Sequence, residues 1–144
     1  MKPPKKSIIY SDKRLYVCMA SYPLAKGHTI IAWKKWVKDL HTLSCEDYDY
    51  LMNMVDVARD ALLRAFKAEK VYLIYMDEAQ HVHWHLVPRY NVEGFNLLNH
   101  QPKKISDFSL AKKIKLNFNL IIKKHHEFDN LPKGYWRCKM VNPK

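Results

Sequence analysis

Three histidines alternate with large apolar residues in the stretch His81-Val82-His83-Trp84-His85-Leu86-Val87-Pro88-Arg89. Side chains on a β-strand alternate between the two faces of a sheet, so the pattern predicts a strand with His81, His83 and His85 on one face. The apolar residues between them would be buried on the other face. Successive imidazoles are expected about 7 Å apart, because a strand rises about 3.3 Å per residue. Ordinary β-formers are available for a solvated face, so three histidines indicate reactivity.

Other short runs rich in β-forming residues predict further strands, and the histidine stretch is itself predicted as a strand over 82–88. Ser11, Asp12 and Lys13 separate the first two runs and are typical of a hairpin turn. The sequence therefore predicts about five strands. The four other runs are 8–10, 15–19, 29–33 and 71–76.

Apolar residues recur at helical spacing between the third and fourth of these runs. Ser44, followed by Asp47, resembles the start of a helix, because a serine side chain can accept a hydrogen bond from the backbone three residues on. The helix is predicted to run to about Lys67, with one apolar face turned to the core. The recurring residues are Leu51, Met54, Val55, Ala58, Leu62 and Ala65.

The C-terminal third fits two kinds of structure. From Ser106 the apolar residues recur at helical spacing, but residues 114–122 also alternate as in a strand. We favour a helix, because Ser106 and Asp107 supply a start signal and the run is long for a strand. The predicted fold class is therefore α+β, with a sheet of about five strands, one central amphipathic helix and a C-terminal helix.

Length and charge limit the size of the protein and the kind of partner. The 144 residues suit a single domain over 1–144, with 1–6 as a mobile basic tail. Lys and Arg number 25 against 14 Asp and Glu, a formal net charge of +11. That charge favours polyanionic partners such as nucleotides, nucleic acid or acidic membranes, although a lysine-rich surface also serves solubility alone.

Cysteines and apolar runs indicate the compartment. Cys18, Cys45 and Cys138 form no C-x-x-C pair, which suits a reducing environment. The first ten residues lack the apolar stretch of a signal peptide, and the longest apolar run, 71–76, cannot span a bilayer. We therefore expect a cytoplasmic protein with no membrane partner.

Two blocks of sequence resemble the histidine triad family. Residues 81–90, HVHWHLVPRY, are similar to its signature of three histidines alternating with apolar residues at the end of a strand. Residues 22–31, YPLAKGHTII, resemble its Pro and Gly-His followed by a hydrophobic strand, with a helix between the two blocks. The resemblance covers roughly 8–90. The triad with its trailing Pro-Arg is a specific motif, whereas Gly-His alone is weak.

This resemblance implies an antiparallel, HIT-like sheet and a nucleotide hydrolase or nucleotidyl transferase of the diadenosine polyphosphate hydrolase type. Family members cleave dinucleoside polyphosphates, nucleoside phosphoramidates or adenylylated compounds at an α-phosphate, through a nucleotidyl-histidine intermediate. They are commonly homodimers without a tightly bound catalytic metal. We therefore expect a nucleotide substrate, a homodimer and no cofactor, although magnesium could neutralise a polyphosphate substrate.

The resemblance also implies roles for individual residues. The family's nucleophile is the middle histidine, which corresponds to His83. His81 and His85 correspond to positions that orient the site and contact the phosphate or the leaving group. His28 matches a supporting histidine at the nucleotide. Arg89 is either a contact for a distal phosphate or an exposed strand-end arginine without a specific role.

The chain departs from the family's pattern at three places. Many members carry Asn or Asp ahead of the Pro and Gly-His block, where it grips the ribose, and this chain has Ala20. A Gly-Gln-Ser/Thr loop that touches phosphate is replaced by the shorter residues 76–80. Some branches place a further histidine where this chain has Trp36. The resemblance therefore leaves the base and the leaving group open.

Histidine suits this reaction because its ordinary pKa of about 6.5 keeps a neutral fraction near neutral pH. If one ring nitrogen of His83 donates to a backbone carbonyl or a neighbouring group, the other presents a lone pair that can attack an α-phosphate. Cationic or donor-rich imidazoles on either side would stabilise charge on the phosphate oxygens and the departing group. Water then cleaves the phosphohistidine-type bond.

Three other interpretations stay open. The histidines could be ordinary surface residues. They could hold zinc, although three on a straight strand span about 13 Å, so two of them plus His28 would be needed. The basic surface could bind nucleic acid, either without catalysis or to remove adenylate from a nucleic-acid end.

Overall fold

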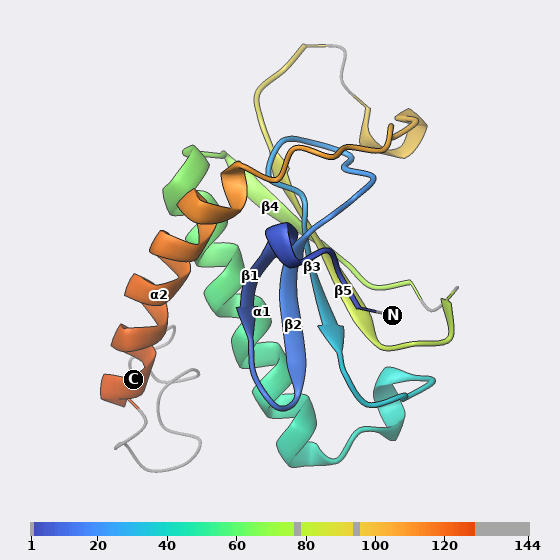
Figure 1. Ribbon diagram of the computed structural model, residues 1–144, viewed down its shortest axis with the longest axis vertical. Helices are drawn as coiled ribbons and strands as arrows, with labels where there is room; N and C mark the ends of the chain where they lie inside the picture. The colour runs from blue at the N-terminus through green and yellow to red at the C-terminus, as the bar shows by residue number, and fades with distance from the viewer. Residues whose placement is uncertain (1, 77–78, 94–95, 129–144) are drawn as a thin grey trace, which may run out of the picture.

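The fold is α+β. It consists of one antiparallel sheet with helices packed on one of its faces (Figure 1). The computed structural model describes residues 2–76, 79–93 and 96–128. In these residues the strands lie in the order β1-β2-β3-β5-β4 and all neighbours are antiparallel, which confirms the predicted fold class. The elements are η1 (Lys5–Ser7), β1 (Ile8–Ser11), β2 (Leu15–Met19), β3 (Thr29–Trp33), η2 (Leu40–Thr42), α1 (Cys45–Phe66), β4 (Lys70–Ile74), β5 (His83–Arg89), η4 (Leu97–Asn99) and α2 (Leu110–Phe128), where η denotes a 3-10 helix.

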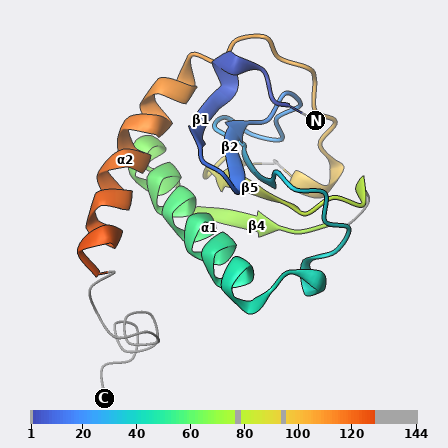
Figure 2. The same ribbon diagram turned by 60° about the horizontal axis from the view of Figure 1, so that its bottom comes forward.

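Helix α1 begins and ends as the sequence predicts. The Ser44 side chain accepts a hydrogen bond from the backbone N–H of Asp47 at 3.1 Å and so caps the first turn. The helix ends where Lys67 adopts a left-handed conformation with φ of 49°. α1 lies along one face of the sheet (Figure 2), and all six residues of the predicted apolar stripe are buried there.

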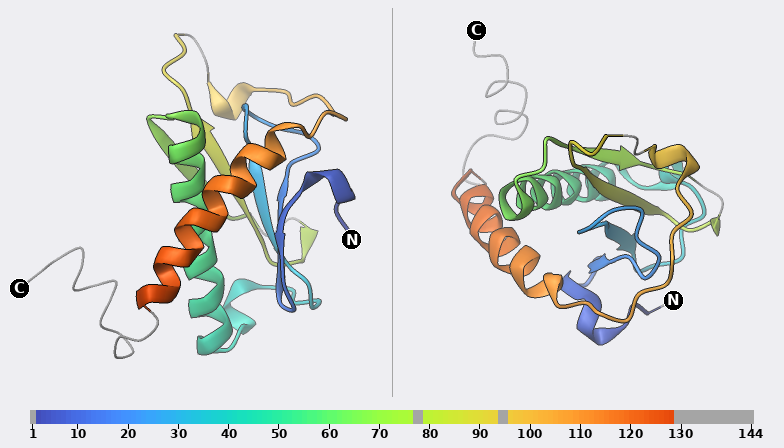
Figure 3. Two further views of the ribbon diagram at one scale, coloured as in Figure 1. Left: turned by 60° about the vertical axis from the view of Figure 1, so that its left-hand side comes forward. Right: turned by 90° about the horizontal axis from the view of Figure 1, so that it is seen from above.

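The C-terminal run is a helix, as favoured, and not a strand. It starts four residues later than predicted, because the side chain of Asp107, rather than that of Ser106, accepts the backbone hydrogen bond before the first turn, from Ser109 at 2.8 Å. Figure 3 shows α2 packed against the outside of α1. No helix within the described residues is long and apolar enough to cross a membrane. The buried residues of α2 are Ala111, Ile114 and Phe118.

The two faces of the sheet have different neighbours. α1 covers one face, and we call the opposite one the open face (Figure 3). Cross-strand pairs place Tyr16, Ala32 and His83 in one row of the open face, and Ile30 and His85 in the next. Side chains at the alternate positions turn toward α1 and form the core: Leu15, Val17, Ile31, Trp33 and Leu86.

Strand β5 begins one residue later than predicted, and β4 ends two residues earlier. The carbonyl of Val82 accepts a hydrogen bond from the backbone N–H of Trp33 at 3.0 Å. The N–H of Val82 donates to the carbonyl of Val37, in the connection beyond β3, also at 3.0 Å. The chain therefore bends at this point, and regular strand starts at His83. His81 lies in the bend, outside β5.

The predicted hairpin between β1 and β2 is confirmed. Asp12 accepts hydrogen bonds from the backbone N–H groups of Arg14 at 2.7 Å and Leu15 at 2.9 Å, which fixes the turn. The last two residues of the predicted tail lie in η1. The mobility of residues 1–6 stays a prediction.

Candidate active site

Three of the predicted histidines meet on the open face. His83 and His85 project from β5, and His28 lies just before β3, beside His85. The ring centroids of His83 and His85 are 4.9 Å apart, and those of His28 and His85 are 5.2 Å apart. The expected spacing of about 7 Å between successive imidazoles is wrong, because it describes positions along a strand and the rings themselves lean together.

The orientation of His83 is fixed by the backbone of its own strand. Its Nδ1 lies 2.7 Å from the carbonyl oxygen of His81. A carbonyl can only accept, so Nδ1 carries the proton and donates it. In the neutral ring the lone pair is then on Nε2, for which the described residues supply no hydrogen-bond partner. His83 thus presents the unprotonated nitrogen that a nucleophile requires.

His28 and His85 form a chain of hydrogen bonds that starts at the backbone. The N–H of Leu24 donates to Nδ1 of His28 at 3.0 Å, so the proton of the neutral His28 ring is on Nε2. That Nε2 lies 3.0 Å from Nδ1 of His85 and donates to it. The proton of His85 is therefore on Nε2, and His85 can donate it to a bound group.

Burial keeps this pair neutral. Desolvation, followed by the neighbouring charge of His85, lowers the pKa of His28 to about 3. Desolvation, followed by the charge of His83, lowers the pKa of His85 to about 4. Of the two alternatives expected for the flanking imidazoles, cationic or donor-rich, the hydrogen bond from His28 and the lowered pKa favour the neutral donor at His85.

His81 precedes the start of β5, but it lines one cavity together with His83 and His85. Its Nε2 donates to the backbone carbonyl of Trp33, and its ring meets the edge of Trp36 at a centroid distance of 5.1 Å. Its own carbonyl accepts from His83. The backbone carbonyl of His81 therefore positions the ring of His83, and a direct contact of the His81 side chain with phosphate stays a prediction.

A cavity of about 300 Å³ opens beside the histidines, and we call it the histidine cavity. Ala32 lies between Tyr16 and His83 in one row of the sheet, and its small side chain leaves a hollow there. Apolar and aromatic side chains form most of the lining, as in many small-molecule sites. The lining residues are Tyr16, Ile30, Ala32, Trp33, Lys34, Trp36, Ala79, His81, His83 and His85.

Lys34 supplies the one lysine or arginine among these lining residues. Its Nζ lies 4.3 Å from the ring centroid of Tyr16 and donates to the backbone carbonyl of Asp12. Sequence reasoning missed Tyr16, Ala32 and Lys34 as site residues. Alternation from His28 along β3 could have found the last two, because every second residue faces the same side.

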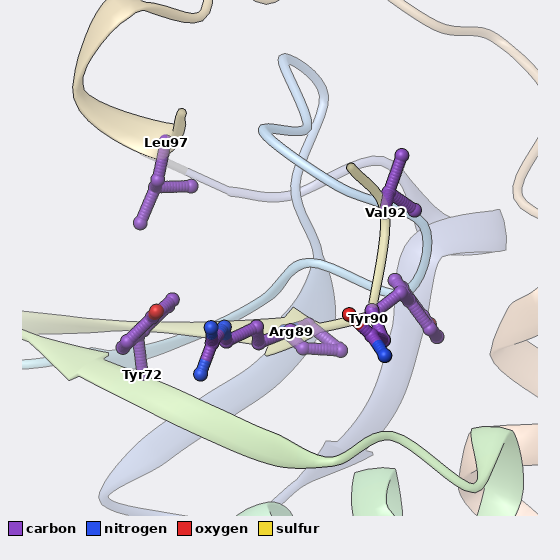
Figure 4. A pocket seen from close by; sticks show the side chains of 7 residues that line it. Tyr72, Arg89, Tyr90, Val92 and Leu97 are labelled. Atoms are coloured by element: carbon purple, nitrogen blue, oxygen red, sulfur yellow. The ribbon is translucent and has the colours of Figure 1, made fainter. Parts of the chain in front are cut away.

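Arg89 lies apart from the histidine cavity, at the far end of β5. Its Nη1 is 4.0 Å from Oε1 of Glu69, a loose and exposed ion pair. Together with Tyr72, Pro88 and four residues of the following segment it lines a smaller cavity of about 70 Å³, the distal cavity (Figure 4). These four residues are Tyr90, Asn91, Val92 and Leu97.

The positions that depart from the family's pattern offer few polar contacts. Ala20 is buried and its N–H donates to the carbonyl of His28 at 2.9 Å, so it holds the loop before β3. Within 76–80, Ala79 reaches the histidine cavity, whereas residues 77–78 lie outside the described residues. Trp36 leaves 69% of its surface exposed beside that cavity.

The hydrogen bonds of the site bear on the zinc interpretation. Nε2 of His28 and Nδ1 of His85 face each other at 3.0 Å, so neither can bind a metal while that bond exists. Within the part of the chain that is described, no three His, Cys, Asp or Glu side chains form a group that could hold a metal ion. Activity without a metal stays a prediction.

The sequence matches the family model of the HIT domain over residues 2–92, so the protein belongs to the HIT domain family. Proteins of this family bind nucleotides, and they are usually nucleotide hydrolases or transferases. A comparison with curated proteins gives no match.

Solved structures of the family superpose on the chain. A Hit-like protein involved in cell-cycle regulation from Bartonella henselae is 27% identical with a TM-score of 0.66, over 77% of this chain and 85% of that one. A zinc-bound histidine triad family protein from Mycobacterium smegmatis is 18% identical with a TM-score of 0.68, over 85% and 89%. A hypothetical histidine triad nucleotide-binding protein from Sulfolobus tokodaii is 17% identical with a TM-score of 0.63, over 91% of each chain.

Proposed function

We propose that the protein is a hydrolase or transferase that cleaves nucleotides at the α-phosphate through a covalent nucleotidyl-His83 intermediate. The observation that carries the proposal is the 2.7 Å hydrogen bond from Nδ1 of His83 to the carbonyl of His81. It leaves the lone pair on Nε2, and His83 is one of the residues that line the histidine cavity. Membership of the HIT domain family supports the nucleotide as substrate.

In the first step, Nε2 of His83 attacks the α-phosphorus. The nitrogen–phosphorus bond forms, and the bond from phosphorus to the leaving group breaks with its electrons on the leaving group. Nε2–H of His85 donates a hydrogen bond to the departing oxygen. His28 holds His85 in the tautomer that makes this possible.

A neutral donor favours one kind of leaving group. His85 receives a hydrogen bond at Nδ1 and is kept neutral by burial, so transfer of its Nε2 proton would leave an imidazolate. A polyphosphate departs as a stable anion and needs only a hydrogen bond, whereas an amine must gain a proton. The site therefore suits phosphoric anhydrides, such as dinucleoside polyphosphates, better than phosphoramidates.

In the second step, water attacks the phosphorus of nucleotidyl-His83. The nitrogen–phosphorus bond breaks, the nucleoside monophosphate leaves, and the proton lost by water goes to solvent. His83 recovers its lone pair on Nε2 because Nδ1 stays bound to the carbonyl of His81. If another acceptor replaces water, the same intermediate makes the protein a transferase.

The histidine cavity suits the nucleoside. Its volume of about 300 Å³ is at the lower end of the range for ligand pockets. Tyr16 and Trp36 offer aromatic surfaces to a base, and Lys34 offers a cation beside them. Because Ala20 cannot grip a ribose, base contacts carry more of the binding in this chain.

The test is a panel of diadenosine polyphosphates, adenosine phosphoramidates and adenylylated nucleic acid, with His83→Ala as the background. Turnover of a diadenosine polyphosphate well above that background supports the proposal, and no turnover of any member refutes it. Removal of adenylate from a nucleic-acid end is less favoured, because helix α2, whose sequence is rich in lysine, lies across α1 from the open face (Figure 3). Assembly as a homodimer and location in the cytoplasm stay predictions.

A further inference from the structure

A tight turn leads the chain into His28. The N–H of His28 donates to the carbonyl of Ala25 at 3.0 Å, so residues 25–28 form a β-turn. Gly27 occupies the third position with φ of 83°, which is typical of a type II turn and is a conformation that glycine adopts without strain. The hydroxyl of Thr29 donates to the carbonyl of Gly27 at 2.9 Å and ties the end of the turn to the start of β3. The turn therefore has one defined conformation.

The ring of Phe66, at the end of α1, packs against this turn. A Cβ atom added to Gly27 would lie 2.5 Å from the ring, closer than Cβ atoms approach other heavy atoms in folded proteins, so the turn and the ring are in direct contact. The Nζ atoms of Lys26 and Lys113 lie 5.6 Å and 5.5 Å from the centroid of the same ring, within the range of cation–π attraction. Phe66 therefore supports one side of the turn.

The hydroxyl of Tyr90 holds the central peptide of the turn. Tyr90 follows β5 directly, and its hydroxyl donates to the carbonyl of Lys26 at 2.7 Å. That carbonyl belongs to the peptide between the two central residues of the turn, and the orientation of this peptide distinguishes a type II turn from a type I turn. Burial raises the pKa of Tyr90, so the hydroxyl keeps its proton at neutral pH and can donate it. Tyr90 thus joins the strand of His83 and His85 to the turn that leads into His28.

The backbone beside the turn decides which nitrogen of His28 carries the lone pair. Leu24, next to the turn, donates its N–H to Nδ1 of His28 at 3.0 Å, so the lone pair is on that nitrogen. Without this contact, His28 and His85 can exchange to the opposite pair of tautomers, in which Nδ1 of His85 donates to Nε2 of His28. Nε2 of His85 would then bear a lone pair and would have no proton to donate. The contact at Leu24 therefore selects one of two states of the histidine pair.

We propose that Tyr90 is a positioning residue that acts through the turn at residues 25–28 to fix the tautomers of His28 and His85. Loss of its hydroxyl frees the central peptide of the turn, and the two rings should then populate both pairs of tautomers. The consequence for turnover rests on the proposed function, because it requires that Nε2–H of His85 meets a leaving group. The consequence for the tautomers does not depend on any reaction.

Nitrogen-15 spectra of the imidazole rings in substrate-free protein test the proposal. Such spectra distinguish a ring nitrogen that carries a proton from one that bears a lone pair. In the unmodified chain, Nε2 of both His28 and His85 should be protonated. Tyr90→Phe keeps the aromatic ring and removes only the hydroxyl, and it should shift both histidines toward a mixture of tautomers. Unchanged tautomers in Tyr90→Phe overturn the proposal.

Two controls separate this effect from a general disturbance of the fold. His83 is an internal reference, because its Nδ1 proton is held by the carbonyl of His81 and should stay in place in Tyr90→Phe. Tyr48→Phe removes the hydroxyl of an exposed tyrosine on α1 and should leave the spectra of all three rings unchanged. A change at His83 as large as that at His28 overturns the proposal, since the hydroxyl would then support the sheet in general.

Kinetics measure the consequence for turnover. Loss of one hydrogen bond between neutral groups should lower kcat by about 2- to 10-fold, with little change in KM. In a His28→Gln background, Tyr90→Phe should cause no further loss, because the two residues act through one route. An additional loss of kcat in that background overturns the proposal. If the protein turns over no substrate, the proposed function fails, and the spectra alone decide the role of Tyr90.

Discussion

Two pairs of histidines form the site, and they are held in different ways. His81 and His83 are tied to backbone carbonyls, whereas His28 and His85 are tied to each other and to one backbone N–H. The first arrangement leaves a lone pair facing the cavity, and the second leaves a proton. In the proposed mechanism, the hydrogen bonds that each ring already makes therefore decide which imidazole attacks and which one donates.

Loss of the attacking ring should have the largest effect. His83→Ala removes the lone pair on Nε2 and closes the two-step route, so kcat should fall by at least about 10⁴-fold. Steady-state kinetics with the best substrate of the panel measure the loss. A fall in kcat of less than 100-fold would indicate that another group, and not His83, is the nucleophile.

Loss of the donating ring should cost less. His85→Ala removes one hydrogen bond to the departing oxygen and should lower kcat by about 10²- to 10³-fold. His85→Gln places an amide N–H near the former Nε2 and should recover part of the loss. His28→Ala leaves His85 in place but frees its tautomer, and a loss of about 10-fold is expected. An equal loss of kcat in His85→Ala and His83→Ala would contradict the distinction between an attacking His83 and a donating His85.

The pair buried in the neutral form should make stability depend on pH. The pKa values of His28 and His85, about 3 and about 4, lie below the ordinary value of about 6.5 that the unfolded chain has. Between the folded and unfolded pKa values, the unfolded state binds protons that the folded state does not bind, so the midpoint of denaturation should fall as pH drops from about 6.5 to about 3. Above that window these two rings contribute no pH dependence. The variant His28→Gln/His85→Gln should show a shallower fall, and an equal one would contradict neutral burial.

Removal of transition metals should have the smallest effect of these changes, because kcat should stay the same. The nitrogens of His28 and His85 that face each other are engaged in their hydrogen bond. Chelation of transition metals should leave kcat unchanged, whereas magnesium could still alter KM by pairing with a polyphosphate. Near-stoichiometric zinc together with activity lost to a chelator and restored by zinc would contradict this.

Local patterns predicted most of the fold. Runs of β-forming residues, together with alternation in the histidine stretch, located all five strands, and the start signal at Ser44 located α1. These features depend on residues close in sequence, because the periods of strands and helices are visible in the order of neighbouring residues. The start of the C-terminal helix was predicted too early, because Ser106 and Asp107 are both capable of capping and only the structure distinguishes them.

The site was less predictable because it depends on contacts between distant residues. His81, His83 and His85 were found from their spacing and His28 from the family resemblance, but the hollow at Ala32 exists only through the pairing of β2, β3 and β5. The position of His81 follows from a bend at Val82 that no local pattern marks. The tautomers likewise depend on which carbonyl or N–H each ring meets in the fold.

The central claim is that His83 becomes covalently nucleotidylated. Brief mixing with labelled substrate, followed by denaturation without acid, should leave one nucleoside monophosphate per chain. Mass spectrometry should map it to His83, in a peptide that contains residues 81–85, and the bond should be labile to acid and comparatively stable to base. Label that persists in His83→Ala protein, or that maps to His28, would contradict the account.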